Sequence, residues 1–192
     1  MKHNHGKPTA AGKSSFDLID VEVFFRELDL RPGVSFLDLA CGRGAYSLKA
    51  AEMVGAAGTI YAVDLWPEGI EHLKVRAAEE NVLNIKAMVG DAGRRIPLDD
   101  QVVDVCLMAT VLHDFVEDQI AEEALREVAR VLKADGLLAI VEFKKIDGPP
   151  GPPVHIRLSP EAIDEMLLPY GFTEERLAEI GPYNYLMLFN RS

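Results

Sequence analysis

Two glycines and two acids follow short apolar segments, at positions where they could contact a ligand. Gly42 and Gly44 close the stretch FLDLACGRG, Asp64 lies twenty residues after Gly44, and Asp91 is the centre of GDA. Glycine lets a backbone approach a ligand closely, and the amides that open a following helix favour polar or anionic groups. Carboxylates accept hydrogen bonds from a ribose diol or from an exocyclic amine. These residue types indicate a ligand that contains a nucleoside, although a tight turn and two loop acids would look similar.

A histidine and an acid follow the next apolar segment, VVDVCLMAT. Imidazole titrates near neutrality, so His113 is a candidate general base. A loop histidine bonded to backbone is the alternative. Asp114 would orient His113 or cap the next helix. Four basic residues further along the chain flank a proline-rich loop and would form either a lid for an acidic substrate or a solvated segment: Lys144, Lys145, His155 and Arg157.

Short apolar strands and helices alternate over most of the chain. Strands are expected at 34–40, 59–65, 85–90, 102–110 and 136–143, and helices at 17–30, 45–54, 67–81 and 117–133. Strands of continuous apolar character that alternate with helices pair in parallel and are covered on both faces. The expected fold is therefore a doubly wound α/β sheet, in which ligands bind outside the carboxyl ends of the strands.

The end of the chain changes this rhythm. DGPPGPP (147–153) is too rich in proline for regular structure, and a helix capped by Ser159 is expected at 159–170. The strands expected at 172–181 and 183–190 are joined only by Gly181 and the proline after it. Because so short a connection cannot make a parallel crossover, these strands are expected to be antiparallel.

The bulk composition narrows the class of protein. The chain has 192 residues, and its net charge of −11 argues against nucleic acid and anionic membranes as partners. Cys41 and Cys106 have no metal-type spacing, so no metal site is expected, and they are read as reduced thiols. No secretory signal or membrane span is apparent. We expect a soluble, cytoplasmic protein with a flexible arm (1–15) and a single domain (16–192); the sequence leaves its oligomeric state open.

Two nucleoside cofactors compete for the glycine pattern. A dinucleotide fingerprint requires Gly-x-Gly-x-x-Gly, but its third glycine is replaced by Ser47. A dehydrogenase also needs a substrate-bearing portion, for which 192 residues leave little room. S-adenosylmethionine, which has a ribose and an adenine but no phosphate, is therefore favoured, and a nucleotide-cofactor oxidoreductase remains the rival.

With these motifs the chain resembles a class I S-adenosylmethionine-dependent methyltransferase of the small-molecule branch, similar to the ubiquinone/menaquinone-biosynthesis methyltransferases. The resemblance spans roughly residues 30–190. Its carriers are LDLACGRG, the acid of AVDL, GDA, the apolar fourth strand and LREVARVLKADGLLAIVEF. The Asn/Asp-Pro-Pro-Tyr motif of amino-directed methyltransferases is absent, and the cysteines do not form an arsenic-binding set.

The resemblance implies a Rossmann-like, seven-stranded sheet of order 3-2-1-4-5-7-6 with strand 7 antiparallel. It also implies S-adenosylmethionine as cofactor, S-adenosylhomocysteine as product, and a small-molecule acceptor. Asp38 and the Ala40–Gly44 loop would hold the methionine end, Asp64 the ribose, and Asp91 with Ala92 the adenine. The complete expected cofactor set is Asp38, Ala40, Cys41, Gly42, Gly44, Asp64, Leu65, Asp91, Ala92 and Ala109. Ala40 replaces the usual glycine, which is tolerable if its backbone angles are ordinary. A cofactor-binding module without transferase activity is the non-enzymatic rival.

Overall fold

The computed structural model describes residue 12 and residues 14–191, and most of the expected N-terminal arm lies outside them. The first half contains η1 (Phe16–Leu18), α1 (Val21–Leu28), β1 (Ser35–Leu39), α2 (Ala45–Val54), β2 (Thr59–Asp64), α3 (Pro67–Glu79) and β3 (Ile85–Val89). The second half contains β4 (Val103–Ala109), α4 (Leu112–Glu117), α5 (Ala121–Val131), β5 (Leu132–Phe143), α6 (Pro160–Leu167), η2 (Leu168–Tyr170), β6 (Phe172–Glu179) and β7 (Asn184–Arg191).

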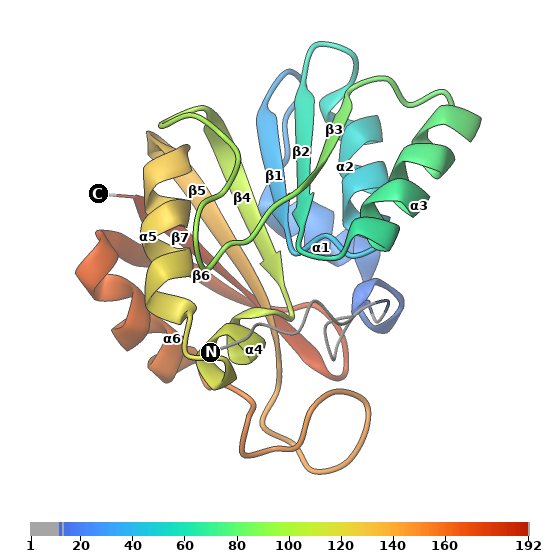
Figure 1. Cartoon of the computed structure of the whole chain (residues 1–192). Helices are drawn as coiled ribbons and strands as arrows, with labels where there is room; N and C mark the ends of the chain where they lie inside the picture. The colour runs from blue at the N-terminus through green and yellow to red at the C-terminus, as the bar shows by residue number, and fades with distance from the viewer. Residues whose placement is uncertain (1–11, 13, 192) are drawn as a thin grey trace, which may run out of the picture.

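One seven-stranded sheet, of order β3-β2-β1-β4-β5-β7-β6, organises the domain (Figure 1). Strands β1 to β5 pair in parallel, and β7 runs antiparallel to both β5 and β6. The expected fold class and the terminal antiparallel hairpin are confirmed. The order along the sheet reverses between β1 and β4, and the carboxyl ends at this switch point are where a ligand is expected in such a sheet.

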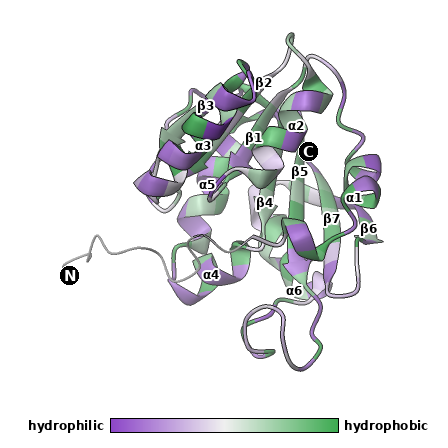
Figure 2. Cartoon of the chain, turned by 90° about the vertical axis from the view of Figure 1, so that its right-hand side faces the viewer, coloured by the Kyte–Doolittle hydropathy of each residue, from purple (hydrophilic) through white to green (hydrophobic). Residues whose placement is uncertain are grey.

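Alternating side chains of the central strands are buried against opposite helix layers. In β1, Phe36 joins the cluster under α1 and α2, whereas Leu37 and Leu39 join the cluster under α5 and α6. This period of two explains why the central strands β1, β4 and β5 are largely apolar, since both of their faces are covered, whereas the edge strand β6 is polar and exposed. Figure 2 shows the polar faces of the helices turned outward from this core.

Both ends predicted for the helix at 117–133 are wrong. The chain forms α4 and α5 instead, and Gln119, with φ 58°, breaks the helical path between them. At the other end, Leu132 already pairs with Val103 in the sheet, because its side chain is fully buried there. The amphipathic pattern predicted a helix as far as Lys133, but the packing of Leu132 into the sheet overrides it.

The first helix also begins later than the expected Asp17. Asp20 caps α1, since its Oδ1 accepts the amide hydrogen of Val23 at 3.0 Å. The N-cap expected for α6 is confirmed, because Ser159 Oγ accepts the amide hydrogen of Ala162 at 3.3 Å.

Candidate functional site

The turn after β1 lies at the switch point and has an unusual backbone. Ala40, Gly42 and Gly44 all have positive φ, at 62°, 56° and 76°. The expectation that Ala40 keeps ordinary backbone angles is therefore wrong. For alanine the left-handed region costs about 1–2 kcal/mol, a steric penalty that glycine does not have. The amides of Ala40 and Cys41 both donate to the carbonyl of Val63, which ties this strained turn to the end of β2.

The two glycines of the turn differ in what surrounds them. A Cβ on Gly44 would overlap the side chain of Leu73, so Gly44 allows α2 and α3 to pack closely. A Cβ on Gly42 would meet nothing within 4 Å, which leaves open space beside this residue. Arg43 between them lies over the ring of Trp66, 5.6 Å from its centroid. Arg43 thus stabilises the turn from outside and leaves the space at Gly42 free.

Asp64 at the end of β2 is bonded directly to this turn. Its Oδ2 accepts the amide hydrogen of Gly42 at 2.7 Å, and its Oδ1 accepts that of Trp66 at 2.7 Å. The side chain is nearly buried, and burial raises the pKa of its carboxyl above the usual value. A carboxylate has about four lone-pair sites. The backbone amides of Gly42, Trp66 and Leu65 act on this one, so at least one site remains for a hydroxyl donor. Leu65 beside it is 56 % exposed and offers an apolar surface to a planar group.

Asp38 is the second acid at the turn and is almost fully buried. Its Oδ2 accepts a hydrogen bond of 2.5 Å from Ser47 Oγ in α2. Burial, with a smaller contribution from the negative charge of Asp64, raises the pKa of Asp38 to about 7. A positively charged group nearby would favour its ionised form. Ser47 had been noted only as a missing glycine, and its role as partner of Asp38 was not predicted.

The remaining expected cofactor residues lie at neighbouring strand ends. Asp91 follows β3; its Oδ1 accepts the amide hydrogen of Gly93 at 3.0 Å, and its Oδ2 lies 3.4 Å from Arg94 Nε. This carboxylate therefore shapes its own turn while staying half-exposed. Ala92 is buried in the core, and Ala109 is half-buried at the end of β4.

His113 lies in the first turn of α4 and is bonded to a residue that the sequence analysis did not select. Its Nδ1 is 2.9 Å from Glu142 Oε1 and 2.8 Å from Glu142 Oε2, and its amide donates to Oε1 at 3.1 Å. Glu142, at the end of β5, is fully buried. Asp114 Oδ1 is 3.6 Å from His113 Nε2, which is longer than a hydrogen bond. The imidazole is thus held by Glu142 rather than by the expected Asp114.

The N-terminal segment crosses this edge of the sheet. Ser15 is buried, with its Oγ 2.9 Å from Tyr46 Oη, and it accepts a hydrogen bond of 3.2 Å from Thr110 Oγ1. Phe16 packs edge-on against Tyr46 with a centroid distance of 5.0 Å. Thr110, directly after β4, has φ 53°, a strained angle for a β-branched residue. Backbone strain of this kind concentrates at binding sites.

The proline-rich loop is organised around Arg157, which is 1 % exposed. All of its N–H directions are used on carbonyls of residues 144–152, at 2.7 to 3.0 Å. Lys145 Nζ donates to the carbonyl of Arg157, and Lys144 Nζ is 3.1 Å from Glu179. Arg157 is therefore a structural anchor, neither the substrate-binding lid nor the solvated residue that the sequence had suggested.

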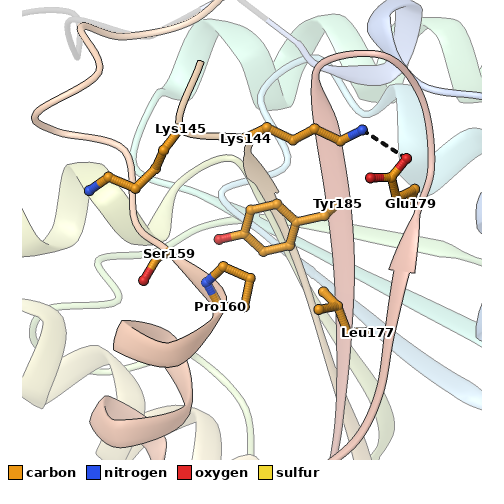
Figure 3. A pocket seen from close by; sticks show the side chains of 7 residues that line it. All are labelled: Lys144, Lys145, Ser159, Pro160, Leu177, Glu179 and Tyr185. Carbon is orange, nitrogen blue, oxygen red and sulfur yellow. Dashed lines mark ion pairs between the residues drawn. The ribbon is translucent and has the colours of Figure 1, made fainter. Parts of the chain in front are cut away.

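A small cavity of about 230 Å³ opens beside this loop. Figure 3 shows the ring of Tyr185 at its centre, with Lys144 turned toward Glu179 and Lys145 turned away. Tyr185 pairs with Glu142 across the antiparallel β5–β7 ladder, so the two side chains lie on the same face of the sheet. The other lining residues are Ser159, Pro160 and Leu177.

Comparison with known proteins identifies the family. Residues 36–136, more than half of the chain, match the family model described as a methyltransferase domain. The chain belongs to this methyltransferase family. It is also 28% identical to a crystal structure described as a SAM dependent methyltransferase from Aquifex aeolicus, with a TM-score of 0.84 and 94% of each chain covered. The expected resemblance and S-adenosylmethionine as the cofactor of the family are confirmed.

Two curated members of the family show how its named activities vary. The nocamycin O-methyltransferase of Saccharothrix syringae is 32% identical over 72% of this chain and 48% of its own length. The ubiquinone/menaquinone biosynthesis C-methyltransferase UbiE of Ectopseudomonas mendocina is 32% identical over 62% of this chain and 46% of its own length. The chain spans about half the length of these curated relatives. Within residues 14–191, every helix falls short of the length and apolarity that a membrane crossing requires.

Proposed function

We propose that the protein transfers the methyl group of S-adenosylmethionine to a small-molecule acceptor. The observation that carries this proposal is the junction of Gly42 and Asp64 at the switch point, with open space beside the glycine and Asp38 behind it. A fold alone does not give a function, but these two carboxylates are hydrogen-bond acceptors that fit a ligand with a ribose and an ammonium group.

The residues of the turn would divide the work of binding. Asp38, whose raised pKa disfavours its charged form, would gain from the ammonium of the methionine end. Asp64 would accept a hydrogen bond from the ribose hydroxyls, and exposed Leu65 would cover the adenine. Asp91 and Ala92 would border the adenine from β3. The cofactor supplies a methyl group on a positively charged sulfur, so the protein has chiefly to align the acceptor and exclude water.

The chemistry of the turn argues against a dinucleotide. A pyrophosphate would lie close to the carboxylates of Asp38 and Asp64, both of which are poorly solvated. Ser47, which stands where the third glycine of a dinucleotide site would be, is already bonded to Asp38. Like charges at such a distance are costly in a low dielectric. An oxidoreductase that binds a nucleotide is therefore the weaker alternative.

The class of acceptor is proposed from the named relatives. One is named for methylation of carbon in ubiquinone and menaquinone biosynthesis and one for methylation of oxygen. We propose a quinol-type or phenol-type acceptor, which offers both atoms. The net charge of −11 supports an acceptor other than nucleic acid. The free cysteines Cys41 and Cys106 support a cytoplasmic location. The continuous sheet from residue 35 to residue 191 supports one domain over 16–192.

Labelled methyl transfer tests this proposal. The full chain would be incubated with S-adenosylmethionine carrying a labelled methyl group and a panel of quinols, phenols, amines and thiols. Label transferred to a quinol or phenol is the expected result. S-adenosylhomocysteine binding without transfer to any acceptor would favour the non-catalytic module, and tight NAD binding without S-adenosylhomocysteine binding would favour an oxidoreductase.

A further inference from the structure

A buried carboxylate lies at the end of β5, where the strand is otherwise apolar. Glu142 is 0 % exposed, and its neighbours Val141 and Phe143 are both buried. Burying a carboxylate is costly unless it is paired and hydrogen-bonded. Glu142 is bonded to the imidazole and amide of His113 and to the amide of Phe143 at 3.2 Å. No other pair of opposite charges in the described part of the chain is buried on both sides.

The pair engages only one of the two imidazole nitrogens of His113, whose side chain as a whole is 5 % exposed. Both carboxylate oxygens lie at Nδ1, and since a carboxylate only accepts hydrogen bonds, we assign the hydrogen of the neutral ring to Nδ1. In the neutral ring Nε2 is then the proton acceptor. Nε2 points away from Glu142, toward Asp114, whose side chain is 39% exposed. His113 follows β4 directly, next to the strand whose turn is assigned to the cofactor.

The charges around His113 come from three elements. Glu142 on β5 and Asp114 on α4 favour the imidazolium, whereas burial and the positive charge of Arg157 in the loop disfavour it. The net result is a raised pKa for His113. Arg157 is fully engaged with loop carbonyls, so it does not take Glu142 away from the histidine.

We propose that Glu142 is a positioning residue that fixes His113 with Nε2 free as general base, and that the methyl acceptor carries an acidic hydroxyl. This inference rests on the proposed function, since it assigns the acceptor side of the same site. An acceptor with no removable proton would have no use for a histidine oriented in this way. A buried carboxylate behind an imidazole is the arrangement that stabilises the imidazolium formed during proton transfer.

The step balances in protons and electrons. The hydroxyl proton of the acceptor moves to His113 Nε2, and the resulting oxygen anion supplies an electron pair. That pair forms the new bond to the methyl carbon, either from the oxygen itself or, by conjugation, from a ring carbon. The bond between methyl carbon and sulfur breaks with its pair left on the sulfur, which becomes neutral. The positive charge of the imidazolium is balanced by Glu142, and the imidazolium later releases its proton to solvent. If a carbon of the acceptor ring has attacked, that carbon also loses its hydrogen to solvent as a proton.

Nitrogen NMR of the histidine rings tests the inference without any turnover. Two-bond proton–nitrogen correlation spectra report the tautomer and pKa of each imidazole, and a His113→Asn variant assigns the signal. In the wild-type protein we expect the Nδ1–H tautomer and a pKa above that of an exposed histidine. In Glu142→Gln, which keeps an acceptor but removes the charge, the pKa of His113 should fall. A Glu179→Gln control on the exposed hairpin should leave it unchanged.

Turnover provides the second readout. With a phenolic acceptor, His113→Asn should lower kcat by about 100- to 10,000-fold, the usual contribution of general base catalysis, and Glu142→Gln should lower kcat by a smaller factor. The rise of kcat with pH should move to lower pH, while S-adenosylhomocysteine affinity stays unchanged. An Nε2–H tautomer in the wild-type protein would overturn the inference even if Glu142→Gln does not fold, as would an unshifted pH profile. If the wild-type protein does not bind S-adenosylhomocysteine, the proposed function is overturned instead.

Discussion

Replacing Arg157 by methionine should release the proline-rich loop while leaving the sheet folded. The guanidinium donates five hydrogen bonds of 2.7 to 3.0 Å to carbonyls of the segment 144–152. Each hydrogen bond that involves a charged group contributes about 1.5–3 kcal/mol, but most of this segment is exposed, so its carbonyls would turn to water in the variant. We therefore take the net cost as that of about two such hydrogen bonds rather than all five, roughly 3–5 kcal/mol.

Hydrogen exchange is the assay that separates loop opening from global unfolding. A cost of this size makes opening about 100- to 4,000-fold more frequent, at 1.4 kcal/mol per factor of ten. The amides to follow are Ile146 and Ile156, which donate to loop carbonyls at 2.8 and 3.0 Å. Leu186 in the paired strand β7 is the internal reference, and Arg157→Lys, with three donors, should be intermediate. Unchanged protection of both loop amides in Arg157→Met would refute this account of the loop.

Two further predictions concern the turn after β1. Ala40→Gly should raise the free energy of unfolding by about 1 kcal/mol, because φ 62° suits glycine, and a lower or equal melting temperature would contradict this. For Asp38, the pKa rises from 3.8 unfolded to about 7 folded, so the native state binds the extra proton between these values and stability falls as pH rises through that window. Asp38→Asn, which cannot ionise, should gain stability relative to the wild type by up to about 4 kcal/mol between pH 4 and pH 7. If the free energies of unfolding of the two proteins change with pH in the same way over this range, the shift is disproved.

The fold was predictable because its signals are local and repeated. The apolar strands, the short connection between the last two strands and the proline run each act through short stretches of chain, and the structure confirms the order and direction of the strands. The boundaries that failed lie where packing decides. Leu132 enters the sheet because its side chain is buried, and α4 is too short, with no side-chain cap, to be visible from periodicity.

The sequence predicted the site only as a group of residues at neighbouring strand ends. The acids and glycines were selected because parallel strands bring their carboxyl ends together, and the structure joins Gly42 to Asp64 across 22 residues. The partner of His113 was missed because Glu142 stands 29 residues away on a strand that is otherwise core. The backbone angle of Ala40 was also out of reach, since a residue type does not reveal φ when the expected glycine is replaced.

Binding of S-adenosylhomocysteine to the wild-type protein and to Asp64→Ala, measured by titration calorimetry, tests the central claim most directly. If Asp64 accepts the ribose hydroxyls, the loss of its bonds should weaken binding by about 1–3 kcal/mol, or roughly 5- to 150-fold. Glu68→Ala, an exposed acid in the first turn of α3, is the matched control and should bind as the wild type does. The account predicts tight binding by wild type and control and weakened binding by Asp64→Ala; equal affinity in all three proteins would contradict it.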